Sequence, residues 1–110
     1  MDTVLSASFP DLAHLLGAYL NQDFDVYGPT IGDAVRAFVD DDPSDHIAAA
    51  RSDIQRFLAL HVGALDAELT RLDPGHAHPP GMPALDYLLW LDRTLADSLA
   101  IKSAQGRAAG

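Results

Sequence analysis

Residues 10–25 read PDLAHLLGAYLNQDFD, and the first part of this stretch predicts an amphipathic helix. Pro10 suits the first position of a helix, where its missing N–H is not needed. The apolar residues that follow recur at intervals of three and four, which places them on one helical face: Leu12, Leu15, Leu16, Tyr19 and Leu20. We expect the helix to fade near Gln22 and residues 23–29 to form a turn at a Gly-Pro breaker.

Similar patterns predict three further helices and no strand. Thr30 and Asp33 resemble a capping box that opens a short helix, which ends before Pro43. A long helix is expected at about residues 44–72, with Gly63 as a place where it can bend. A last helix starts at Pro83 with these leucines facing inward: Leu85, Leu88, Leu89, Leu95 and Leu99. The sequence therefore predicts an all-α fold, a compact bundle of about four helices.

Length and composition predict one domain over residues 1–110, with a tail that frays from about residue 102. The chain has no cysteine, which excludes a disulfide framework and a thiolate zinc site. Its beginning, MDTVLSASF, lacks the basic and apolar regions of a secretory signal. No apolar run approaches the roughly 20 residues that cross a bilayer. We therefore expect a soluble cytoplasmic protein.

Sixteen Asp and Glu residues against seven Lys and Arg residues give a formal net charge of −9. A field of this sign repels phosphate backbones and anionic lipid, which argues against nucleic acid or a membrane as the partner. It attracts basic proteins and speeds their encounter. Solubility alone would also account for such a charge.

The sequence contains none of the common catalytic motifs, such as G-x-S-x-G, the P-loop, H-E-x-x-H or G-x-G-x-x-G. The run DFDVYG at residues 23–28 departs from a calcium loop at Tyr27 and at its twelfth position. His76 and His78, with Asp73 nearby, would need a further rigid ligand to hold zinc, so solvated loop histidines are the simpler interpretation. We expect no enzyme, no cofactor and no metal site.

An interaction surface is what the sequence offers instead. Large aromatic residues anchor protein interfaces, and carboxylates around them pair with Arg and Lys of a basic partner. The residues that we predict to bind a partner are Tyr19, Asn21, Asp23, Phe24, Asp25, Tyr27, Asp40, Asp41 and Asp42. Packing of the first helix explains Tyr19 equally well, and helix capping is an open alternative for Asp23 and Asp25.

Residues 9–12, FPDL, followed by LGAYLNQDF at residues 16–24, resemble the CdiI-type immunity proteins of bacterial contact-dependent growth inhibition. Members of that family carry a segment like F-P-x-L…F-L-G-A-Y-F-H-Q-D-W. The order of helices is similar over most of the chain, whereas specific motifs are confined to the first 25 residues. Asn21 stands where His is usual and Phe24 where Trp is usual, which keeps polarity and aromaticity at these positions.

This resemblance implies a cytoplasmic protein without enzymatic activity that binds the C-terminal toxin domain of a cognate CdiA-type protein. Such toxins are commonly nucleases with basic, phosphate-binding sites, so the acidic composition agrees with the resemblance. An alternative for a member of this family is that the motif supports the fold and that the toxin contacts lie elsewhere. Two alternative functions stay open. One is a metal-binding protein that uses His76, His78 and Asp73, and the other is a homo-oligomeric helical module with Trp90 in a self-interface.

Overall fold

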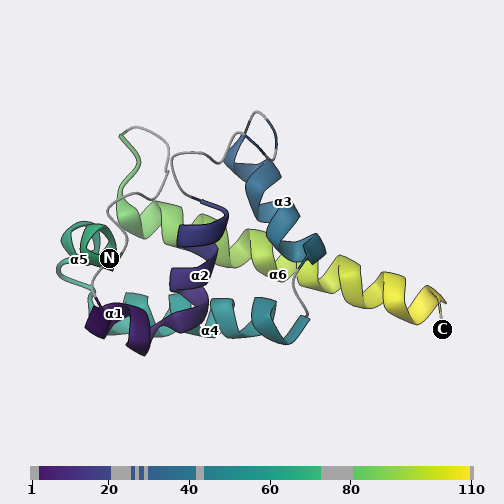
Figure 1. Ribbon diagram of the computed structural model, residues 1–110, viewed down its shortest axis with the longest axis horizontal. Helices are drawn as coiled ribbons and strands as arrows, with labels where there is room; N and C mark the ends of the chain where they lie inside the picture. The colour runs from purple at the N-terminus through teal and green to yellow at the C-terminus, as the bar shows by residue number, and fades with distance from the viewer. Residues whose placement is uncertain are drawn as a thin grey trace.

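The computed structural model describes residues 3–20, 26, 28, 30–41, 44–72 and 81–109, and within them it has six helices and no strand (Figure 1). The helices are α1 (Thr3–Ser8), α2 (Pro10–Ala18), α3 (Ile31–Asp41), α4 (Ser44–Leu60), α5 (Leu65–Leu72) and α6 (Ala84–Ala109). The prediction of an all-α fold is confirmed.

Two features raise the number of helices above the four expected. The first is α1, whose six residues are too few to show a helical period and which the sequence pattern did not reveal. The second is a break at residues 61–64, which divides the predicted long helix into α4 and α5. Gly63 lies in this break, and Gly inside a helix costs about 1 kcal/mol relative to Ala. The expected bend is therefore a complete interruption.

The helix ends also differ from expectation. Helix α2 ends at Ala18, and the N–H groups of Tyr19 and Leu20 both bond to the carbonyl of Leu15 at 3.1 Å. The bond from Leu20 spans five residues instead of the four of a regular α-helix, a pattern that closes helix ends, so the helix stops before Gln22. Helix α6 continues to Ala109, and the fraying expected from about residue 102 stays a prediction.

The predicted capping box at the start of α3 is confirmed. Thr30 Oγ1 accepts a hydrogen bond from the Asp33 N–H at 3.2 Å, and Asp33 Oδ2 accepts one from the Thr30 N–H at 3.0 Å. The Thr30 hydroxyl also donates to Asp33 Oδ2. These hydrogen bonds from the Thr30 side chain and backbone lower the pKa of Asp33 below its ordinary value of 3.8. Arg36, one turn later, contributes in the same direction.

The core lies where α4 packs against α6 on one side and α2 on the other (Figure 1). The predicted stripe of α2 is inside, with Leu12, Leu15 and Leu16 fully buried. Tyr87 of α6 is also fully buried, which raises the pKa of its hydroxyl. The molecule measures 44 × 29 × 23 Å, and none of the helices described has the length and hydropathy to cross a membrane.

The prediction for the inward face of α6 is wrong at two positions. Leu88 and Leu95 are buried as expected, but Leu85 is 46 % exposed and Leu89 47 % exposed. The partners of α6 are α4, α3 and α5, and together they cover only part of its circumference. A leucine spacing of three and four identifies an apolar helix face without revealing how much of that face is covered.

Candidate interaction surface

The FPDL motif is built into the fold rather than presented at the surface. Phe9 is 1 % exposed and packs edge-on against Phe57 at 5.1 Å between ring centroids. Pro10 then occupies the first turn of α2, as its fixed φ favours. Phe9 stands at the N-cap position and has no side-chain acceptor for the free N–H groups of that turn. Those groups need a partner from elsewhere in the chain.

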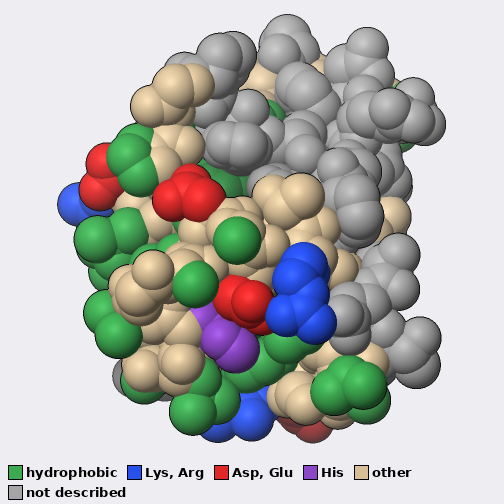
Figure 2. Space-filling model, turned by 90° about the vertical axis from the view of Figure 1, so that its left-hand side faces the viewer, with side chains coloured by type: hydrophobic (Ala, Val, Ile, Leu, Met, Phe, Trp, Pro, Cys, Tyr) green, Lys and Arg blue, Asp and Glu red, His purple; other side chains and the backbone are tan. Residues whose placement is uncertain are grey.

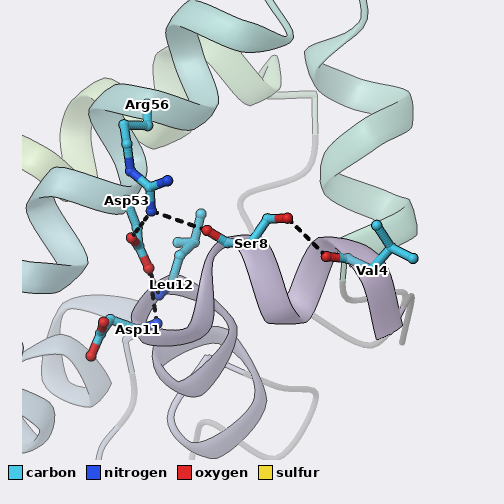
Figure 3. Close-up of polar contacts among 6 residues, drawn as sticks. All are labelled: Val4, Ser8, Asp11, Leu12, Asp53 and Arg56. Carbon is cyan, nitrogen blue, oxygen red and sulfur yellow. Dashed lines mark hydrogen bonds and ion pairs between the residues drawn. The ribbon is translucent and has the colours of Figure 1, made fainter.

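Asp53 of α4 is that partner (Figure 3). Its Oδ2 accepts hydrogen bonds from the N–H groups of Asp11 at 2.9 Å and Leu12 at 3.1 Å. Asp53 is 4 % exposed, and its negative charge lies at the positive end of the α2 dipole. The carboxylate therefore caps α2 from a different helix.

Arg56 completes this network. Its Nη2 bonds to Asp53 Oδ1 and donates to the carbonyl oxygen of Ser8 at 3.0 Å, the end of α1 (Figure 3). Its guanidinium carbon also lies 5.0 Å from the centroid of the Phe9 ring, within cation–π range. One Asp-x-x-Arg pair of α4 thus holds α1 and α2 together. This part of the motif is a scaffold.

Neither Asp53 nor Arg56 was expected from the sequence to have such a role. The available signal was the position of Asp53 between Ala50, Ile54 and Phe57 on the inward face of its helix. A carboxylate in such a place is rarely buried without hydrogen-bond partners. The spacing of three residues between Asp53 and Arg56 indicated one such partner. The two backbone N–H groups, in contrast, lie more than 40 residues away in the sequence.

The predicted partner-binding residues divide into two groups. Tyr19, Asp40 and Asp41 lie within the described residues. The structure does not describe the others: Asn21, Asp23, Phe24, Asp25, Tyr27 and Asp42. Tyr19 is half-buried and packs edge-on against Phe38 at 5.4 Å and His14 at 5.9 Å, so part of its ring serves the core.

Asp40 and Asp41 are exposed in the last turn of α3, and Asp45 is exposed in the first turn of α4. We refer to these three residues as the acidic surface. The last turn of α3 contains no basic residue. Arg36, one turn earlier, and Lys102 line the same depression as Asp40, but Arg36 pairs with Asp33 and Lys102 Nζ donates to the Val39 carbonyl at 2.7 Å. None of the three carboxylates has a cation partner within the described part of the chain.

Most of the described arginines already have a carboxylate partner. Their ion pairs are Arg36–Asp33 at 3.1 Å, Arg51–Asp92 at 2.9 Å, Arg56–Asp53 and Arg71–Glu68 at 2.9 Å. The positive charges of these side chains are therefore directed at acids of the same chain. The carboxylates of the acidic surface have no such partner, so their negative charge acts on the surroundings. Exposed charge of this kind attracts a basic protein.

The histidines form no metal site within the described residues. There, no group of three or more His, Asp or Glu side chains could hold a metal ion. His61 is partly buried, and its ring centroid lies 4.8 Å from that of Phe57. Its Nδ1 lies 3.9 Å from Glu68 Oε2. His61 therefore takes part in the packing of the core. His76, His78 and Asp73 lie outside the described residues, so the metal-binding alternative is untested.

Fold and surface together define a small, acidic, all-α protein with exposed carboxylates at the end of α3 and the start of α4. Comparison with known families then gives a match between residues 8–97 and the family described as CdiI immunity protein. The match covers most of the chain, including the Asp53 network, and the chain therefore belongs to the CdiI immunity protein family. Its role is that of an immunity protein, which neutralises a toxin. No curated protein and no solved structure matches the chain.

Proposed function

We propose that this protein acts in the cytoplasm by binding the C-terminal toxin domain of a cognate CdiA-type protein, and that this toxin is a nuclease. A nuclease active site binds phosphate and therefore carries Lys and Arg. An acidic partner of 110 residues with a net charge of −9 complements such a site. The chain performs no reaction in this scheme, since blocking the toxin is sufficient.

The observation that carries the proposal is the placement of Asp40 and Asp41 at the C-terminal end of α3. Carboxylates at this end oppose the helix dipole and cost about 0.3–1 kcal/mol each. Neither forms an ion pair with a cation among the described residues, although Arg36 and Lys102 line the same depression as Asp40. Charges that destabilise the free protein are well explained by a partner that supplies the missing cations.

We propose the remaining predicted residues as contacts of the same toxin. Asp42 directly follows the acidic surface in the sequence. The aromatic and acidic segment comprises Tyr19, Asn21, Asp23, Phe24, Asp25 and Tyr27. An aromatic anchor with carboxylates around it is the residue combination that binds a basic protein with both affinity and register.

The test uses the toxin domain encoded beside this chain. We expect the purified protein to form a one-to-one complex with that domain and to abolish its cleavage of RNA or DNA. The double variant Asp40→Lys/Asp41→Lys should associate at least about tenfold more slowly, with a flatter salt dependence. Dissociation should change less, because long-range charge acts mainly on encounter.

The matched control is Asp40→Asn/Asp41→Asn, which removes the charges and keeps the shape of the side chains. Its association rate should lie between those of the wild type and the Lys variant. Identical association rates for all three proteins across a salt series would remove the acidic surface from the interface. A toxin that stays fully active with an excess of the wild-type chain would refute the function itself.

A further inference from the structure

Apolar side chains are exposed in several separate groups at the end of the molecule where α4 is followed by α5 (Figure 2). Leu60 is 68 % exposed, Val62 78 % and Leu85, from the first turn of α6, 46 %. Val62 and Leu85 line one common depression, and we refer to these two residues as the apolar face. Scattered exposed leucines are ordinary, whereas a group of them around a depression marks an interaction site.

A groove of about 450 Å³ runs through the apolar face. Val62 and Leu85 contribute its large apolar side chains, while Gly63, Ala64 and Ala67 contribute small ones. A Cβ atom built on Gly63 would meet nothing within 4 Å, so the space above this glycine is open. The groove can therefore receive a side chain of a partner without any rearrangement of its walls.

The charges around the groove indicate what kind of partner fits. Asp66 lines it and uses Oδ1 to accept a hydrogen bond from the Ala84 N–H at 2.9 Å. Asp86 is exposed next to Leu85 and has no cation partner in the described part of the chain. No Lys or Arg is found among the described residues that line the groove. An apolar centre with an acidic rim fits an apolar side chain flanked by basic residues.

These charges also argue against a second copy of this chain as the occupant. Each copy has a net charge of −9, and a symmetric contact at this face would bring the same acidic rims towards each other. A basic protein meets no such repulsion. We therefore propose that the groove anchors an apolar side chain of the cognate toxin, flanked there by Lys or Arg. This inference rests on the proposed function and assigns a second contact region to the same partner.

The two regions are close enough for one partner. The acidic surface adjoins the start of α4 and the apolar face its end, which are about 24 Å apart at 1.5 Å per residue. An interface of standard size, about 800 Å² per partner, is roughly 30 Å across. In this arrangement the acidic surface determines mainly the association rate, and the groove determines mainly the dissociation rate of the complex.

The test fills the groove without disturbing the fold. Gly63→Leu places a side chain in the open space, at a residue whose backbone is outside the left-handed region. We expect it to raise the dissociation rate of the toxin complex by about tenfold or more and to leave the association rate unchanged. Ser52→Leu, at an exposed site in the middle of α4, is the matched control and should leave both rates unchanged.

A second variant tests the rim. Asp86→Lys should slow association and, unlike Gly63→Leu, its effect should shrink with salt, because it acts through charge. Wild-type kinetics for both Gly63→Leu and Asp86→Lys would overturn this inference and leave toxin neutralisation intact. A dimer of the free protein that Gly63→Leu dissociates would reassign the groove to a second copy. A wild-type chain that does not bind the toxin would overturn the function and the inference together.

Discussion

At the scale of single residues, Asp53 has the largest structural role of any charged side chain described. It is the one acidic residue that the described core buries, and it satisfies two backbone N–H groups of α2 and the guanidinium of Arg56. Hydrogen bonds to a charged acceptor contribute more than neutral ones, about 1.5–3 kcal/mol. Its removal also leaves the first turn of α2 uncapped.

We expect Asp53→Ala to lower the free energy of unfolding by about 2–3 kcal/mol, measured by urea denaturation. Asp53→Asn should cost less, because one oxygen still accepts a hydrogen bond. The matched control is Asp45→Ala in the exposed first turn of the same helix, which should cost less than about 1 kcal/mol. Equal losses for Asp53→Ala and Asp45→Ala would contradict the capping role.

At the scale of elements, α3 carries acids at both ends with opposite consequences. Asp33 at its N-terminal end completes the capping box, and the hydrogen bonds from Thr30 lower its pKa. The stability that Asp33 contributes is therefore present above its ordinary pKa of 3.8 and is lost as the pH falls through the lowered value. Asp40 and Asp41 at the C-terminal end oppose the dipole of the same helix.

Because Asp40 and Asp41 oppose the helix dipole, removal of their charges is expected to stabilise the free protein. Asp40→Asn and Asp41→Asn should each stabilise the free protein by about 0.3–1 kcal/mol in urea denaturation, although they weaken its encounter with the toxin. Asp33→Asn, the control at the other end of α3, should destabilise it. A loss of stability in the Asp40 and Asp41 variants would show that these carboxylates serve the fold.

At the scale of the whole molecule, the charge of −9 acts on folding as well as on binding. At about 10 mM salt the Debye length is roughly 30 Å, which is comparable to the 44 × 29 × 23 Å dimensions of the protein. Nearly all carboxylates then repel one another. At about 150 mM salt the Debye length is roughly 8 Å, and mainly the local ion pairs are still felt.

We therefore expect sodium chloride to stabilise the free protein while it slows toxin association. Between about 10 and 150 mM, the midpoint of thermal unfolding should rise by about 4 °C, which corresponds to roughly 1 kcal/mol. Calorimetry at constant pH checks this. A midpoint that falls with added salt would mean that the internal ion pairs outweigh the general repulsion.

Much of the fold could be predicted because helical periodicity is a local signal. The stripe from Leu12 to Leu20, the Thr30–Asp33 capping box and the exposure of Asp40 and Asp41 follow from neighbours in the sequence. Helix α1 is too short to give such a signal. The break near Gly63 depends on whether the packing energy of a continuous helix exceeds the cost of a glycine inside it.

The parts that could not be predicted depend on contacts that are remote in the sequence. Asp53 binds backbone N–H groups, and these carry no sequence signature. Leu85 looks like a core residue by spacing, and its exposure follows from where α5 and α4 end beside it. The groove could not be predicted for the same reason, since the sequence does not show which helix faces are covered by neighbours. Its small residues Gly63 and Ala64 resemble an ordinary turn.

The cap that Asp53 provides also sets an order of events during synthesis. A helix of nine residues is marginal in water by itself, and α2 carries no local acceptor at its N-terminus. The ribosome must therefore release the chain beyond residue 53, and α4 must form, before α2 acquires a lasting partner. A truncated product that ends before α4 is thus expected to be unstructured and open to proteases, so no partial immunity protein accumulates.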